Sequence, residues 1–193
     1  MGTRGAFGVR VDGVDKVGYN QYDSYPSGRG VEVLKFVKAF LAKPKFEAEV
    51  YTLARDLKVV DDDKKPTKAE RDALKQWANL DVSNQTLTDW YCLLHKSHGD
   101  IAKTLECGYV VDHLSFLTDS LFCEWAYIVN FDDRTLEVYS GFQKEGHARG
   151  RYSATKPNSG GYYPVGLVKA YSFDALPTDA KFIKECDPPE DAD

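Results

Sequence analysis

Residues 121–142 read LFCEWAYIVNFDDRTLEVYSGF, and this stretch decides the fold. Large side chains recur in it with a period of two, at Trp125, Tyr127, Val129 and Phe131. Such alternation, in a segment rich in aromatic and β-branched residues, is typical of a strand. The polar Asp132-Asp133-Arg134 then forms a turn. We therefore predict a β-hairpin in which residues 121–131 pair with residues 135–142.

The start of the chain predicts a second hairpin, over residues 6–20. Its two halves read AFGVRV and DKVGYN, and Asp12-Gly13 lies near the turn between them. An Asp-Gly pair between alternating segments is a strong local signal for a hairpin. A further strand is predicted over residues 165–173.

Helical spacing of apolar residues dominates the middle of the chain. The expected helices cover residues 31–41, 46–57, a third segment opened by Pro66 and the Thr67-x-x-Glu70 capping box, residues 87–96, and residues 100–107. Strands at both ends of the sequence with helices between them predict an α+β domain. In it, about five helices pack on a mostly antiparallel sheet, and the first hairpin pairs with the later one. We expect one domain over residues 1–184 and an acidic flexible tail over 185–193.

Composition narrows the class of protein. The chain has 193 residues, 42% of them hydrophobic, which suffices for one sizeable core. A net charge of −5 argues against a general nucleic-acid binder, because such proteins carry a basic surplus. The sequence has neither an apolar run long enough to span a bilayer nor a secretory signal, so we expect a cytoplasmic protein, in the host cytoplasm if viral, without a membrane partner.

Cysteine and histidine spacing gives no metal motif. The four cysteines form no CxxC pair, and no carboxylates complete a ligand set around His95, His98 and His113. We therefore expect neither a metal nor another cofactor.

The segment DSYPSGRG, residues 23–30, is the best candidate for a binding site, because it runs into the first helix. Free N–H groups and the helix dipole favour an anion at such a place. Gly28 and Gly30 allow close approach of a ligand, and Arg29 offers a bidentate fork. Ordinary turn and cap chemistry is the alternative interpretation.

Arg4 is expected to join this site, since it is followed by Gly5 at the start of a strand. The first hairpin would bring Arg4, Asn20, Asp23 and Arg29 to one edge of the sheet, with Asp23 as a counter-charge. A purely structural ion pair is the alternative. Tyr25, like Tyr19 and Tyr22, has a flat face suited to stacking on a base or sugar, and equally to packing.

The loop at residues 146–161 is a second candidate, because Arg149 and Arg151 alternate there with small and polar residues. A long basic loop of this kind can close over an anionic ligand. A solvated loop without function is the alternative.

The opening motifs resemble a protein family found in phages, bacteria and some fungi. Its members begin with Gly-Thr-Arg-Gly, here residues 2–5, and continue with Tyr-Asn-x-x-Asp-Ser-Tyr-Pro-x-Gly-x-Gly, here residues 19–30. Residues 124–132 and 136–142 also fit. The resemblance implies no particular activity, although a phage origin would make a host-interaction or anti-defence role natural.

The start is also similar to that of N-terminal nucleophile hydrolases. It departs from them at the decisive position, because removal of Met1 would expose Gly2, which has no nucleophile.

These observations lead to three hypotheses. The first is a cytosolic protein that binds an anionic, nucleotide-like molecule at the N-terminal site and, in a phage, sequesters a host immune signal. The second is a hydrolase that uses Asp23 as general base on a phosphate or acyl group. The third is a module that docks a host protein, which an exposed apolar patch near Trp90 or Trp125 would favour. A homo-oligomer is compatible with all three.

Overall fold

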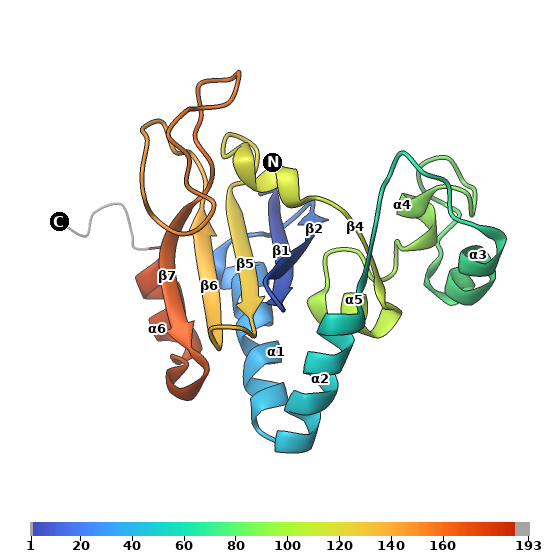
Figure 1. Cartoon of the computed structure of the whole chain (residues 1–193), viewed down its shortest axis with the longest axis horizontal. Helices are drawn as coiled ribbons and strands as arrows, with labels where there is room; N and C mark the ends of the chain where they lie inside the picture. Colours follow the sequence, from blue (N-terminus) through green and yellow to red (C-terminus); the bar gives the residue numbers. More distant parts are fainter. Residues whose placement is uncertain (1, 188–193) are drawn as a thin grey trace.

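The computed structural model describes residues 2–187, which fold around a five-stranded sheet of order β2-β1-β5-β6-β7 (Figure 1). The strands are β1 (Gly5–Val11), β2 (Val14–Asn20), β5 (Trp125–Asn130), β6 (Thr135–Ser140) and β7 (Gly166–Ser172). β1 runs parallel to β5, and every other neighbouring pair is antiparallel. The two predicted hairpins therefore lie side by side in one sheet, and the α+β class is confirmed.

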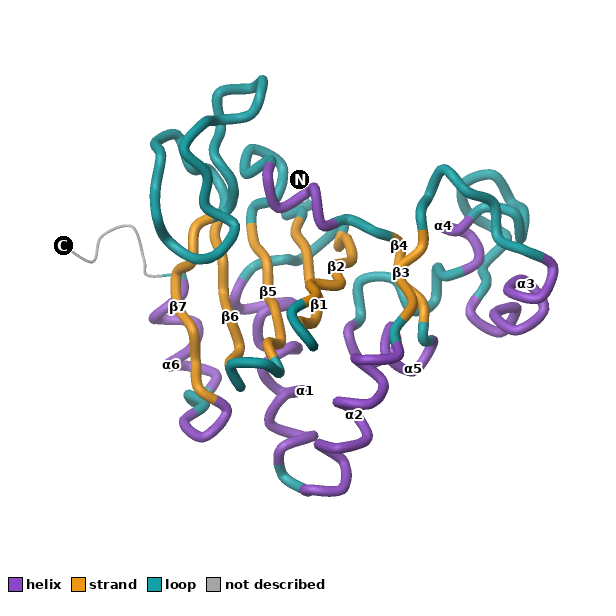
Figure 2. Tube along the Cα trace, viewed as in Figure 1, coloured by secondary structure: helices purple, strands orange, loops and turns teal. Residues whose placement is uncertain are grey.

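Within residues 2–187, six α-helices accompany the sheet. They are α1 (Val31–Leu41), α2 (Pro44–Asp56), α3 (Lys68–Leu74), α4 (Trp90–Leu93), α5 (Ile101–Cys107) and α6 (Asp179–Cys186). α1, α2 and α6 lie on one side of the sheet, whereas α3 and α4 lie beyond its β2 edge (Figure 2). A small parallel pair, β3 (Lys58–Val60) and β4 (Tyr109–Val111), lies between the sheet and these two helices.

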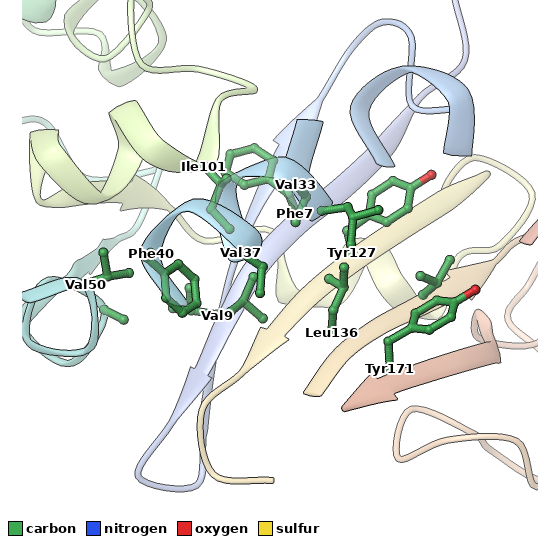
Figure 3. Close-up of a cluster of buried hydrophobic side chains, with 14 of the residues drawn as sticks. Phe7, Val9, Val33, Val37, Phe40, Val50, Ile101, Tyr127, Leu136 and Tyr171 are labelled. Atoms are coloured by element: carbon green, nitrogen blue, oxygen red, sulfur yellow. The ribbon is translucent and has the colours of Figure 1, made fainter. Parts of the chain in front are cut away.

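The main core lies between the sheet and α1. Phe7, Val9, Tyr127 and Leu136 point from the strands toward Val33, Val37 and Phe40 of α1 (Figure 3). A second core covers the other face of the sheet, where Ala126 and Ile128 pack with Leu117, Val165 and the partly buried Tyr152. Both faces are therefore shielded, one by helices and the other by loop segments.

The turn of the first hairpin connects it to the second hairpin. Asp12 and Gly13 both have positive φ, 52° and 77°, as a two-residue turn of this type requires. Their backbone N–H groups donate to the Asp132 carboxylate at 2.8 and 2.9 Å. The acidic turn of the later hairpin thus fixes the end of the first one.

The predicted boundary of the flexible tail at residue 185 is wrong. Helix α6 continues to Cys186, which is buried, and the Tyr171 hydroxyl donates to Glu185 at 2.9 Å. The Thr178 side chain caps the start of this helix, and the fully buried Phe182 holds it on the core. Residues 188–193 of the predicted tail lie outside the described residues.

Replacing Gly30 with alanine is expected to lower the free energy of unfolding by about 1–3 kcal/mol, because the core around Gly30 has no room for a side chain. A Cβ atom at Gly30 would lie 2.8 Å from the ring of Tyr127, which is fully buried and donates to the Ser24 carbonyl. Urea unfolding measures the effect. Gly160→Ala is the control, since only Asn158 lies near its added Cβ, at 3.3 Å; equal losses would contradict the prediction.

Lys16 caps the end of helix α2, and we expect Lys16→Met to cost about 1–2 kcal/mol of stability. Its ammonium donates to the carbonyls of Ala54, Arg55 and Leu57 at 3.0, 2.6 and 2.8 Å. Thermal unfolding compares this variant with Lys45→Met on the same helix. The Lys45 side chain is 92% exposed, and its ammonium lies as far as 3.9 Å from the Glu49 carboxylate. Loss of this weak surface pair should change stability by less than about 0.5 kcal/mol.

Candidate functional site

Arg4 and Asn20 lie at the same edge of the sheet, as the predicted first hairpin requires. Gly5 pairs with Asn20, which brings Arg4 beside the end of β2. The Asn20 amide donates to the Ser24 hydroxyl at 2.7 Å, and the Ser24 N–H donates to the Thr3 carbonyl at 3.2 Å. The Arg4 N–H donates to Glu124 at 3.1 Å. The cluster is thus held together mainly by its own hydrogen bonds.

The expectation of free N–H groups at the start of the first helix is wrong. The N–H groups of Gly28 and Gly30 donate to the Tyr25 carbonyl at 3.0 and 3.1 Å, and that of Arg29 donates to the Asp23 carbonyl at 2.8 Å. The wide helical turn η1 (Pro26–Gly30) closes back on the residues before it and consumes these donors. An anion would therefore find no free donor among these three.

The predicted pairing of Arg4 with Asp23 is also not formed. The Arg4 guanidinium lies over the Phe122 ring, 4.6 Å from its centroid, and makes no salt bridge within residues 2–187. Arg29 pairs with Glu32, one turn further along, and its Nε is buried without a hydrogen-bond partner among residues 2–187. Both arginines therefore keep some capacity for another anion.

The two arginines of the second candidate loop have different surroundings. Arg151 donates to Glu137 at 2.5 Å and to Asp15 at 2.8 Å, so two carboxylates balance its charge. Although burial opposes it, hydrogen bonding to these carboxylates raises the pKa of Arg151. Arg149 donates to the amide oxygen of Gln143, which lies just before the loop. Arg151 thus fastens the loop to the sheet, as a structural bridge.

A cavity of about 250 Å³ opens beside the β2 edge of the sheet, next to the N-terminal cluster. It lies between the strands β1, β2 and β4 and the segment that contains α4. Its lining residues are Phe7, Gly18, Tyr19, Asp62, Trp90, Tyr91, Leu94, Ser97, His98, Thr104, Tyr109, Val110, Val111 and His113. None of the predicted ligand-binding residues lines it; Tyr19, noted for stacking, does.

Aromatic rings form the walls of this cavity. Trp90 and Tyr109 stack with centroids 6.2 Å apart and an interplanar angle of 24°. The Trp90 indole N–H donates to the Lys64 carbonyl at 2.6 Å, and Lys58 donates to the Tyr109 hydroxyl at 3.0 Å. Because these polar atoms are already bonded, the rings can offer a ligand mainly apolar surface.

Two histidines flank Tyr19 within the cavity. The ring centroid of Tyr19 lies 6.0 Å from that of His98 and 5.6 Å from that of His113. Burial, followed by electrostatic repulsion from the His113 and His95 imidazoles and the Arg29 guanidinium, lowers the pKa of His98 from 6.5 to about 4. His98 is therefore uncharged at neutral pH.

The N-terminal cluster supports the wall that contains His98. Gly99 follows it with φ of +75°, and a Cβ atom there would lie 2.6 Å from Asn20 Oδ1 and 3.8 Å from Arg29 Nη2. Arg4 belongs to the same edge, because the next residue, Gly5, pairs with Asn20. Burial raises the pKa of Tyr19, and the charge of Arg4 opposes this effect. The cavity and the cluster are thus parts of one neighbourhood.

Sequence reasoning missed most of the cavity, because its walls come from separate segments. Trp90, around which an exposed apolar patch would have favoured the docking hypothesis, is only 4% exposed and belongs to a wall of the cavity. Tyr22, Tyr25, Phe122 and Phe142 are large exposed side chains that lie outside the lining. Of the lining residues, the sequence had drawn attention to Tyr19 for stacking and to His98 and His113 only as candidate metal ligands.

Comparisons of the chain with protein-family models, with curated proteins and with solved structures gave no match. Within residues 2–187, no three His, Cys, Asp or Glu side chains are grouped so that they could hold a metal ion. In the same part of the chain, no helix has the length and apolar character to cross a bilayer. The proposal below therefore rests on the geometry of the site.

Proposed function

We propose that this protein binds a small anionic, nucleotide-like molecule in the cavity beside β2. The observation that carries the proposal is the aromatic lining with two histidines around about 250 Å³. Ligand pockets usually span roughly 300–1,000 Å³, so this one suits a single ring system with a small substituent. Aromatic walls with a few polar groups are the usual surroundings of a bound base.

The arginines behind the cavity support the anionic part of the proposal. Arg4 lies near Tyr19 and has no salt bridge within the described part of the chain, and Arg29 lies beside the turn of His98 and Gly99. Glu32 balances the charge of Arg29, so Arg4 is the cation that would attract an anion to this side of a protein with a net charge of −5. A phosphate attached to a bound ring would therefore be stabilised near Arg4.

Binding without turnover is the activity we propose. Asp23, the candidate general base of a hydrolase, is exposed and does not line the cavity. The opening motifs resemble a family that occurs in phages, and a binder of nucleotides in that setting would sequester a host signal in the host cytoplasm. Capture alone suffices for such a role.

Calorimetry with a panel of nucleotides and cyclic nucleotides tests the proposal. We expect Tyr19→Ala to weaken binding by about tenfold or more, because it removes a stacking surface. Tyr25→Ala is the matched control, since Tyr25 belongs to the same motif but lies outside the lining and is 45% exposed. Absence of binding by the wild type, or an equal loss in both variants, would refute the proposal.

A further inference from the structure

We infer that the ligand enters the cavity base first, with an N–H group of the base donating to Nε2 of His113 and the phosphate remaining outside. The inference rests on the proposed function and specifies which end of a nucleotide is recognised. It follows from two properties of the described lining: which of its polar groups have no protein partner, and that none of its residues is a lysine or an arginine.

Most polar groups of the lining already have protein partners. The Thr104 hydroxyl donates to the Ser97 carbonyl at 3.0 Å, and the Ser97 hydroxyl donates to the Leu94 carbonyl at 2.9 Å. The Tyr19 hydroxyl donates to the Gln21 side chain. Together with the bonded Trp90, these groups leave recognition to the histidines, to Asp62 and to the O–H donors of Tyr91 and Tyr109, the second of which only accepts a hydrogen bond, from Lys58.

His113 can offer a ligand a hydrogen-bond acceptor. Its Nδ1 lies 3.1 Å from the Val111 carbonyl, which can only accept, so Nδ1 holds the proton of the neutral ring. Nε2 then presents a lone pair. Among residues 2–187, the His98 ring makes no hydrogen bond, so it can adopt either tautomer to suit the same ligand.

A phosphate is poorly matched to this lining. In the part of the chain that the structure describes, no lysine or arginine lines the cavity, and Asp62 adds a negative charge. Burying a phosphate against a lone pair would cost its hydration without a compensating cation. Arg4, which precedes the Gly5–Asn20 pair, and Arg29, whose Nη2 lies near Gly99, are both outside the lining, so the favourable charge lies outside the cavity.

The direct test compares three probes with the wild-type protein: adenosine 5′-monophosphate, adenosine and ribose 5-phosphate. Titration calorimetry should show that adenosine keeps its affinity within about tenfold of the monophosphate, whereas ribose 5-phosphate loses about a hundredfold or more, because stacking is lost. The same comparison is then made for a second base, with guanosine 5′-monophosphate and guanosine.

A cycle of variants and analogues tests the hydrogen bond. An adenosine analogue doubly methylated on its amino nitrogen should bind the wild type about tenfold more weakly, and His113→Phe should weaken adenosine by a similar factor. The two losses should not add. Arg4→Gln should weaken the monophosphate but leave adenosine unchanged. His147→Phe is the control, since the Nε2–H of His147 donates to the Pro164 carbonyl, outside the cavity.

The outcomes separate the two proposals. If ribose 5-phosphate binds as tightly as the monophosphate, or if the methylated analogue binds the wild type unweakened, the inference is overturned and the proposed function stands. If no nucleotide binds, the proposed function fails and the inference fails with it. The methylated analogue keeps the test decisive even if His113→Phe does not fold.

Discussion

Replacing Arg151 with methionine will lower the free energy of unfolding by about 2–4 kcal/mol, because it leaves a buried carboxylate without its cation. The Glu137 side chain is 7% exposed, and Arg151 donates to both of its oxygens at 2.5 Å. Asn130 and Tyr139 also donate to Glu137, at 2.8 and 2.9 Å, but neither supplies a charge. The Arg151 side chain is itself 25% exposed, which keeps the expected loss below that of a fully buried pair.

Arg149→Met is the matched control for this change. Arg149 belongs to the same loop, has the same charge and donates to the Gln143 side chain, with no carboxylate partner within residues 2–187. Its replacement should change the free energy of unfolding by no more than about 0.5 kcal/mol, as is usual for surface positions. Urea unfolding of the two variants measures the difference. Equal losses would show that the ion pair does not fasten the loop.

The fold was largely predictable because its decisive signals are local. The period of two in residues 121–131 and the Asp12-Gly13 turn act within a few residues, and both hairpins form where they were expected. Helix α6 was missed because prolines and acidic residues surround it, which favours a frayed end. Its stability comes from Phe182 and Cys186, whose burial depends on distant strands.

The candidate site was less predictable, because its properties depend on tertiary contacts. The segment Gly28-Arg29-Gly30 has the composition of an anion-binding helix start, yet the carbonyls of Asp23 and Tyr25 occupy its donors. That outcome depends on the wide turn η1, which no local rule indicates. The cavity joins residues as far apart as Tyr19 and His113, and their proximity carries no periodic signal in the sequence.

Acidification will reduce the stability of this protein between about pH 6.5 and pH 4, and His98 will account for part of the loss. Burial, followed by the charges of His113, His95 and Arg29, lowers the pKa of His98 from 6.5 to about 4 in the folded state. In the unfolded chain the same group takes up its proton nearer pH 6.5. Between these values the unfolded state binds more protons, so stability falls as the pH falls. The full contribution, about 3 kcal/mol, is present above pH 6.5.

His98→Gln removes this titration and should flatten the curve of unfolding free energy against pH in that window. Urea unfolding at intervals from pH 4 to pH 8 separates two effects. The difference between the proteins at pH 8 reports the altered packing around Tyr19 and Tyr91, whose rings lie 6.0 and 5.4 Å from His98. The change in slope below pH 6.5 reports the proton alone. If both proteins lose stability equally from pH 6.5 to pH 4, His98 is not held neutral in the cavity, and the lining would then present a charged imidazole to any ligand.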